Sequence, residues 1–415
     1  MISLVEALHY RCLRYVRRPL RRFQVLVGPN ASGKTTCLDV PALLGRLVSQ
    51  GLDAAIGERT QNFQDLVWRR QGRRLELAVE ASIPGELRER LSNPRLDTIR
   101  YEVGLGLLVG SDEAAILSER VLLKESKPSH PDDSTLFPLA QAPVKTILTP
   151  KGVRGSQTVL NKLPNGNDNF YDETGKGWDH AFKLGARKSA FGNLPEDESK
   201  FPAASWLKRL LTDGIQQIVL NSLLIRRASP PGQARGFKSD GSNLPWVIAQ
   251  VAKKTPNRFK DWIAHLQTGL PDIEDITTRE RPDDKHRYLV VRYRGNIEVP
   301  SWMVSDGTLR LLALSLFAYL PDFRGTFLIE EPENGIHPRA VETVFQSLSS
   351  VYDAQVLLAT HSPVILSVVK AEDVLCFAKD HDGATAIVSG DRHPALRDWK
   401  GEENLGVLYA SGVLG

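Results

Sequence analysis

Cysteine is scarce in this sequence, and long apolar runs are missing. The three cysteines, Cys12, Cys37 and Cys376, stand far apart, so their spacing supports neither a disulfide framework nor a zinc site. The longest apolar stretch, residues 311–320, is about half of the roughly 20 residues that a helix needs to cross a bilayer. We therefore predict a cytoplasmic protein that has no membrane partner.

A strong excess of one charge is also missing, because 53 Lys and Arg against 49 Asp and Glu leave a net charge of +4. That total is too small to indicate nucleic-acid binding by itself. Basic residues do gather locally, as six arginines between positions 11 and 22 and as a looser group at 226–238. Such clusters can hold a phosphate backbone or can simply be solvated surface, so DNA stays open as a candidate partner.

The strongest chemical signal follows a short apolar strand pattern at 23–27. The next residues, GPNASGKT, match G-x-x-x-x-G-K-[ST] in full, and a helix pattern begins directly after them. Glycines let backbone N–H groups point at phosphate oxygens, Lys34 brings a positive charge to the β- and γ-phosphates, and the Thr35 hydroxyl is a Mg²⁺ ligand. The predicted nucleotide-binding residues are Asn30, Ala31, Ser32, Gly33, Lys34, Thr35 and Thr36.

A second apolar strand pattern, at 326–329, ends in two carboxylates. Side chains alternate across a strand, so Glu330 and Glu331 point in different directions and suit different tasks. Glu330 is placed to hold Mg²⁺, and Glu331 can polarise the water that attacks the γ-phosphate. In a chain without a P-loop, two exposed glutamates before a proline turn would be the simpler interpretation.

A third apolar strand pattern, at 355–359, ends in Thr360-His361-Ser362. One helix fits between it and the strand at 326–329 that ends in the two glutamates, the acid strand. This strand–helix–strand spacing predicts a parallel sheet. Ligands bind at the carboxyl ends of such strands. We therefore expect His361 to contact the γ-phosphate.

A polar turn at 305–308 opens a helix-patterned apolar run that ends at Pro321. Its hydroxyl, its N–H groups and the positive end of the helix dipole suit an anion. Many helices begin with a serine cap and bind no ligand, so the turn alone does not decide its role. Ser305 and Gly307 are its candidate phosphate ligands.

Along the chain these four pieces follow the order P-loop, Ser-x-Gly turn, acid strand with paired glutamates and strand-end His. In that order they resemble the ABC-type ATPase heads of the RecF, SMC and OLD-like group, as do the phrases VLVGPNASGKTT, SDGTLRLLAL, LIEEPENGIHP and LLATHSPVIL. The resemblance covers about residues 1–125 and 205–380. It implies an α/β fold, namely a P-loop ABC-ATPase head with a mixed sheet, an antiparallel subsheet and helices. It also implies an ATPase that converts ATP and water to ADP and phosphate, with ATP and Mg²⁺ bound.

In that group two heads pack head to tail, which implies a homodimer or higher oligomer. Ser305 and Gly307 then contact the γ-phosphate on the P-loop of the partner. Two departures stand out, since Asp306 occupies a position that is usually Gly and Glu330 a position that is usually Asp. We expect Asp306 to cap the helix, and we assign the metal-sensing glutamine of the group to Gln64.

We predict three parts of the chain. Residues 1–125 form an N-terminal lobe with the P-loop and antiparallel strands, 126–240 form an inserted, partly helical lid, and 241–415 form a C-terminal lobe. Within the insert, 203–225 reads as a helix pair or one broken helix, because apolar residues recur at three- and four-residue spacing. The apolar tail at 405–415 is expected to cover a sheet edge.

Two outputs stay open for the predicted ATP-dependent switch. The first is a DNA-associated ATPase that works with a separate nuclease or toxin in phage defence or genome maintenance. It follows from the OLD-like resemblance, because too few residues follow His361 for the nuclease domain that such proteins often carry. The second is an ATP-locked scaffold that holds a partner effector inactive, with little turnover.

Overall fold

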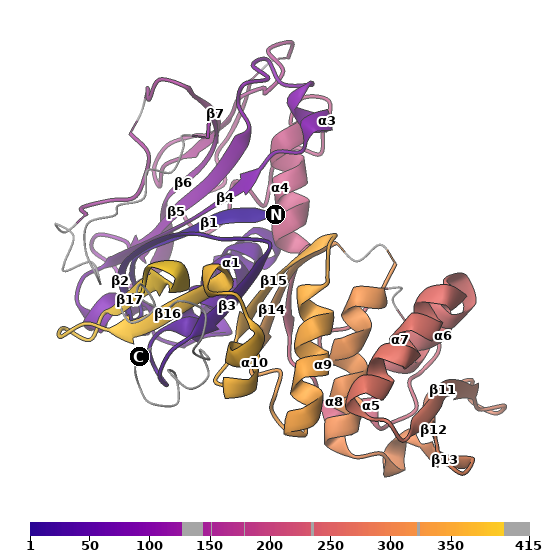
Figure 1. The fold of residues 1–415 in the computed structure, drawn as a ribbon. Helices are drawn as coiled ribbons and strands as arrows, with labels where there is room; N and C mark the ends of the chain where they lie inside the picture. The colour runs from indigo at the N-terminus through magenta and orange to yellow at the C-terminus, as the bar shows by residue number, and fades with distance from the viewer. Residues whose placement is uncertain (127–143, 151, 178, 234–235, 322–323, 394–415) are drawn as a thin grey trace. The chain divides into compact units, whose positions relative to one another are not determined.

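The computed structural model describes residues 1–126, 144–150, 152–177, 179–233, 236–321 and 324–393. Figure 1 shows their fold. Internal contacts divide the chain into two units that are each discontinuous in sequence. Unit 1 holds Met1–Arg21, Gly28–Ile215 and the segment that starts at Leu375, and unit 2 holds Arg22–Val27 and Gln216–Val374. The three-part division remains a prediction, and the tail at 405–415 lies outside the described residues.

Unit 1 is built on an antiparallel sheet. The strand order is β2-β1-β4-β5-β6-β7-β8-β9, and β4, β5 and β6 are antiparallel strands within residues 1–125, where such strands are predicted. The described strands β7 to β9 fall in the predicted lid, yet they continue this same sheet. The bounds are β1 Ile2–Tyr10, β2 Leu13–Pro19, β4 Arg74–Ser82, β5 Thr98–Leu107, β6 Ala114–Lys124, β7 Ser156–Lys162, β8 Asp168–Phe170 and β9 His180–Phe182.

Helix α1 (Lys34–Gln50) is the main helix beside this sheet, and it contacts α4 (Pro202–Thr212), β1 and β4. Gly45 permits the close approach to α4, because a Cβ there would lie 2.4 Å from the Leu211 carbonyl oxygen. Unit 1 also contains the hairpin of β16 (Val374–Lys379) and β17 (Thr385–Ser389). Its short helical segments are α2 Leu52–Gly57, α3 Gly85–Arg88, η1 Phe63–Leu66, η2 Trp68–Arg70 and η6 Gly390–Arg392.

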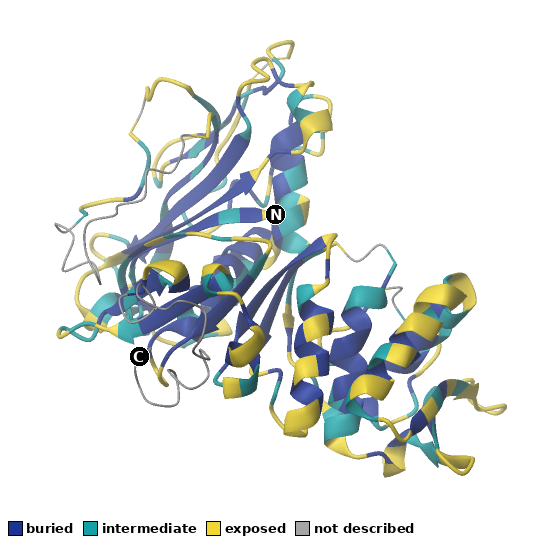
Figure 2. Ribbon diagram, in the orientation of Figure 1, coloured by how far each residue is buried: buried dark blue, intermediate teal, exposed yellow. Residues whose placement is uncertain are grey.

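Unit 2 contains the predicted parallel strands. Strand β15 (Ala354–Ala359) pairs in parallel with β14 (Gly325–Glu330) on one side and with β3 (Phe23–Val27) on the other. Helix α9 (Pro338–Ser349) connects β14 to β15, so the strand–helix–strand prediction is confirmed. The interiors of these strands are buried (Figure 2), which explains why they read as continuous apolar runs.

The helix prediction for 203–225 is wrong in its middle. The chain forms α4, then strand β10 (Ile215–Ile218) beside β14, and then α5 (Ser222–Ile225). Gly214 lies between the end of the first helix and the strand, and two β-branched isoleucines begin and end the four-residue strand. Apolar spacing over so short a run cannot separate a strand from a helical turn, and pairing with β14 decides the outcome.

The rest of unit 2 is mostly helical, with one small antiparallel sheet of strand order β11-β12-β13. Helix α6 contacts α7, and α7 and α8 both contact α9. Among the described residues, no helix has the length and apolar character needed to cross a bilayer. The bounds are α6 Leu244–Lys254, α7 Pro256–Gly269, β11 Ile273–Glu280, β12 Arg287–Tyr293, β13 Ile297–Pro300, η3 Ser301–Met303, α8 Asp306–Ser315, η4 Leu316–Tyr319, α10 Pro363–Val368 and η5 Ala371–Asp373.

Candidate nucleotide site

The glycine-rich loop leaves the carboxyl end of β3 and ends where α1 begins at Lys34. The Lys34 ammonium is buried and donates to two carbonyl oxygens of the loop, those of Gly28 at 2.8 Å and Pro29 at 2.9 Å. The N-cap of α1 is Gly33, with φ 105°, and no side chain caps the helix. The first-turn N–H groups of a 17-residue helix are therefore not occupied by a capping side chain.

The β16–β17 hairpin contacts this loop and supports it. Thr385 Oγ1 donates to the Ser32 carbonyl oxygen at 2.8 Å, and the Thr385 N–H donates to the Cys12 carbonyl oxygen at 3.0 Å. Glycine is required at two positions, because a Cβ on Gly33 would lie 2.3 Å from Thr385 Oγ1 and one on Gly28 would lie 2.2 Å from the Phe377 carbonyl oxygen. Sequence reasoning missed this support, since its residues lie more than 340 positions away.

The loop fits a phosphate group. The backbone is left-handed at Ala31 (φ 61°) as well as at Gly33, a conformation that turns successive N–H groups toward one concave side. Ser32 Oγ is buried and has no hydrogen-bond partner among the described residues. The lysine is held within the same loop, so the residues needed to bind a polyphosphate are assembled together.

The acid strand ends as the sequence predicts, with Glu330 as the last residue of β14. Gln217 Nε2 on β10 lies 3.5 Å from Glu330 Oε1. Glu331 leaves the strand with a left-handed φ of 46°, and its N–H donates to the Ala359 carbonyl oxygen at 2.8 Å. Non-glycine residues in this conformation are strained, and such strain gathers at functional sites. The two carboxylates therefore have different surroundings, in agreement with different tasks.

His361 follows the end of β15, at the same edge of the parallel sheet as Glu331. The Thr360 N–H donates to the Leu26 carbonyl oxygen at 3.1 Å, which brings the end of β15 beside the end of β3. The chain continues from β3 directly into the P-loop. Three strand ends that carry the sequence-predicted groups thus meet at one edge, where ligands bind in parallel sheets.

The Ser-x-Gly turn begins helix α8, and Ser305 is its N-cap. Ser305 Oγ accepts from the Thr308 N–H at 3.2 Å. The expectation that Asp306 caps the helix is wrong, because its carboxylate pairs with Arg226 instead. Gly307 packs against the turn that follows the acid strand, since a Cβ there would lie 2.3 Å from the Gly335 carbonyl oxygen.

Two glutamines compete for the role of metal sensor. Gln64 lies on η1 in unit 1, and its Oε1 is buried without a hydrogen-bond partner among the described residues. Gln217, which the helix prediction concealed, lies next to Glu330 in unit 2. The choice of Gln64 therefore stays a prediction, and Gln217 is a second candidate.

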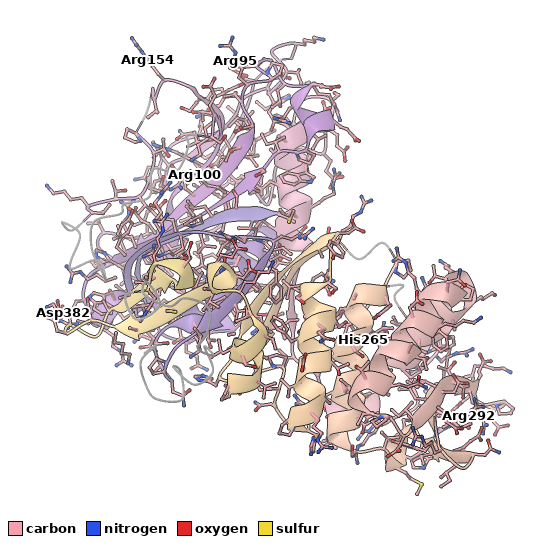
Figure 3. The ribbon with its side chains drawn as sticks, viewed as in Figure 1. Arg95, Arg100, Arg154, His265, Arg292 and Asp382 are labelled. Carbon is pink, nitrogen blue, oxygen red and sulfur yellow. The ribbon has the colours of Figure 1, made fainter. Side chains whose placement is uncertain are left out.

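The N-terminal arginines are engaged within the chain. Arg14 Nη1 lies 3.2 Å from Asp382, which Figure 3 labels at the β16–β17 hairpin. The Arg18 guanidinium donates to the Ile387 carbonyl oxygen, and the guanidinium of Arg22 lies 5.0 Å from the centre of the Tyr352 ring. Arg11 pairs with Asp39 and Arg17 with Glu6. These contacts argue against one continuous basic surface made by this cluster.

A loop of this geometry at the carboxyl edge of a parallel sheet defines a P-loop nucleotide-binding protein. A family model described as "AAA domain, putative AbiEii toxin, Type IV TA system" matches residues 23–367, and the chain belongs to that family. The Old nuclease of Escherichia phage P2 is 30% identical over 163 residues, which cover 35% of this chain and 26% of that protein. The chain therefore matches about a quarter of the length of that relative. Together these findings make the chain an ATPase of the RecF, SMC and OLD type.

The comparison with solved structures concerns the fold alone. The SmcHead bound to the C-winged helix domain of ScpA is 12% identical with a TM-score of 0.52, over 93% of this chain and 96% of that one. A Smc head with an extended coiled coil, bound to the C-terminal domain of ScpA from Pyrococcus furiosus, is also 12% identical, with a TM-score of 0.47 over 93% and 95%. The first likeness confirms the predicted ATPase-head fold.

Proposed function

We propose that this chain hydrolyses ATP and that its ATP-bound state is an assembly switch. The P-loop carries the proposal, because a left-handed glycine loop, a buried lysine held by loop carbonyls and an uncapped helix start occur together. This combination suits the phosphates of a nucleotide and has no evident structural use of its own. The family and the fold support the same nucleotide chemistry.

The residue roles follow from the chemistry of phosphoryl transfer. Lys34 exchanges the carbonyl oxygens of Gly28 and Pro29 for oxygens of the β- and γ-phosphates. Thr35 and Glu330 are the residues that would hold Mg²⁺, which when bound neutralises charge on the phosphate oxygens. Glu331 takes the proton of the attacking water, and His361 donates to a γ-phosphate oxygen.

The second half of the proposal is head-to-tail assembly. Ser305 is exposed at the start of α8, so its hydroxyl and the helix N-terminus face solvent. We place them, with Gly307, on the γ-phosphate bound by the P-loop of a second copy. Assembly then requires ATP. Hydrolysis separates the two copies, because ADP lacks the phosphate that they share.

Light scattering combined with phosphate-release assays tests both halves. We expect Glu331→Gln to lower turnover more than ~100-fold, which is the usual cost of losing a catalytic group, while still forming an ATP-dependent dimer. Ser305→Arg should remain monomeric, and Glu342→Gln, on the exposed face of α9, should behave as wild type. The proposal would be refuted if the molar mass does not change when ATP is added and the wild-type chain shows no ATP turnover.

For the output we favour DNA-associated work with a separate nuclease or toxin, in phage defence or genome maintenance. The support is that one relative is named a nuclease and that the family is described as a putative toxin. The ATP-bound Glu331→Gln dimer should then gain mass with short duplex DNA. Absence of any gain, with DNA in excess, would contradict this output.

One observation favours a second output, an ATP-locked scaffold that holds an effector partner inactive. Arg11, Arg14, Arg17, Arg18 and Arg22 have partners within the chain, which weakens the electrostatic case for DNA. A scaffold needs ATP binding but not turnover. Glu331→Gln would then keep the biological activity, whereas Lys34→Ala would lose it, with Lys253→Ala as the control for a lost surface charge.

A further inference from the structure

Glu333 lies in the turn between β14 and α9, two residues after Glu331, and none of the motifs assigns it a role. Its Oε1 accepts two hydrogen bonds from the segment that follows β15. Thr360 Oγ1 donates at 2.6 Å, and the backbone N–H of His361 donates at 2.9 Å. The other oxygen, Oε2, is buried and has no hydrogen-bond partner among the described residues.

These two hydrogen bonds add to others that hold the segment at 360–362 in place. On one side the Thr360 N–H is bound to the Leu26 carbonyl oxygen at 3.1 Å, at the end of β3. On the other side the Ser362 N–H donates to Thr360 Oγ1 at 2.9 Å, and Ser362 caps α10. The backbone around His361 is therefore hydrogen-bonded to β3, to the segment that begins α10 and, through Glu333, to the turn between β14 and α9.

The turn between β14 and α9 is itself held by internal hydrogen bonds. The Asn334 N–H donates to the Glu331 carbonyl oxygen at 3.0 Å, and the Ile336 N–H donates to that of Glu333 at 3.0 Å. The Asn334 side-chain amide also donates to Glu331 Oε2. Glu333 thus belongs to the same rigid turn that sets the direction of the Glu331 carboxylate.

We propose that Glu333 is a positioning residue, which holds His361 at a fixed distance from Glu331 for the hydrolytic step. The proposal rests on the proposed function, because it assumes that both residues act on the γ-phosphate. Glu333 acts through His361 and does not touch the substrate. Small displacements of catalytic groups are costly, up to ~100-fold in rate for about 1 Å.

Turnover of matched variants tests this role. We expect Glu333→Ala to lower kcat about 30-fold while the Kd for ATP changes less than ~3-fold, since no P-loop residue is altered. Glu333→Gln keeps a carbonyl oxygen that can accept both bonds, so it should retain activity within about 5-fold. Glu342→Ala, a glutamate on the exposed face of α9, should turn over as wild type does.

A double variant separates positioning from general loss of structure. Because Glu333 acts through His361, Glu333→Ala should lower turnover less than ~3-fold further in a His361→Ala background. Amide exchange at His361 should also become about 10-fold faster in Glu333→Ala, without faster exchange in the core of β15. Independent, multiplying losses in the double variant would overturn the proposal.

The failure of this inference differs from the failure of the proposed function. If the wild-type chain turns over, His361→Ala is impaired and Glu333→Ala is not, then only the role of Glu333 is refuted. If the wild-type chain does not turn over ATP, the proposed function is refuted, and the role of Glu333 is refuted with it.

Discussion

Arg226 and Asp306 form an ion pair, with Arg226 Nη2 2.8 Å from Asp306 Oδ1. Asp306 stands beside Ser305 at the start of α8, in a position where the resemblance to ABC-type heads implies glycine. An added carboxylate would repel a phosphate there, and the guanidinium neutralises it. The Arg226 carbonyl oxygen also accepts from the fully buried Ser301 Oγ at 2.9 Å, which ties the backbone of Arg226 to the segment preceding the turn.

Loss of Arg226 should therefore weaken ATP-dependent assembly more than it weakens the fold. We expect Arg226→Met to raise the ATP concentration needed for assembly about 10-fold, because the charge of Asp306 is then unopposed. The free energy of unfolding should change by less than about 1 kcal/mol, since the pair is partly exposed.

The rescue variant makes this prediction specific. Asp306→Gly in the Arg226→Met background removes the unopposed charge and should restore assembly, measured by light scattering against ATP concentration. If Asp306→Gly does not rescue, Arg226 acts in another way than by neutralising Asp306.

The parts of the site that sequence could predict are those in which one short segment carries both the element and its chemistry. The P-loop, the acid strand with Glu330 and Glu331, and the strand before His361 each combine an apolar run with polar residues at its end. A strand buried on both faces and a glycine loop impose these patterns locally, so no knowledge of the partner strands is needed.

The missed parts depend on contacts between distant segments. Thr385 supports Ser32 from a hairpin more than 340 residues away, and Arg226, the residue that follows α5, neutralises Asp306 at the start of α8. Gln217 was hidden because a four-residue strand has no periodicity of its own, and only pairing beside β14 makes it a strand. Tertiary pairing cannot be read from one sequence with no alignment.

Thr385 should matter for nucleotide affinity although it is far from the motif in sequence. Thr385→Val keeps the shape but removes the donor to the Ser32 carbonyl oxygen, a buried hydrogen bond. We expect a weakening of ATP binding by about 1 kcal/mol, or roughly 5-fold, as the loop loses its fixed conformation. Isothermal titration with ATP measures this directly.

Two controls accompany Thr385→Val. Thr385→Ser keeps the hydroxyl and should bind ATP as wild type does. Thr326→Val makes the same change at another buried threonine, whose Oγ1 donates to Gln355 at 3.0 Å within unit 2, and should lower stability without changing the ATP affinity. Equal affinity of Thr385→Val and wild type would show that the hairpin does not support the loop energetically.

The two glutamine candidates make opposite predictions about magnesium. Gln217 lies beside Glu330, so we expect Gln217→Ala to raise the Mg²⁺ concentration for half-maximal turnover about 10-fold. Gln64→Ala should leave it within ~2-fold, because the role of Gln64 would then be packing of η1. Turnover measured over a Mg²⁺ titration, with Gln346→Ala on α9 as a surface control, decides between them. The reverse order would establish Gln64 as the metal sensor.

Glu173 should make the stability of unit 1 depend on pH. Its carboxylate is buried at the start of α4, where Oε2 accepts from the Ala203 N–H at 2.7 Å and Oε1 from the Ala204 N–H at 2.8 Å. Burial, the largest cause, raises the pKa of Glu173 from 4.5 to about 7, although the two backbone hydrogen bonds oppose the rise. The folded chain therefore keeps a proton that the unfolded chain releases between these two values.

The sign of the effect follows from proton binding. Stability from this group is fully present below about pH 4.5 and falls as the pH rises to about 7, because the folded state binds more protons in that range. Between these two pH values the pKa shift corresponds to a loss of roughly 3 kcal/mol in the free energy of unfolding. Glu173→Gln stays neutral at every pH, so its stability should not show this fall. Thermal unfolding of both chains from pH 4.5 to 8 measures the difference, with Glu342→Gln as the control. Parallel curves for wild type and Glu173→Gln would mean that the carboxylate is already ionised at pH 4.5 and that the N–H groups of α4 outweigh its burial.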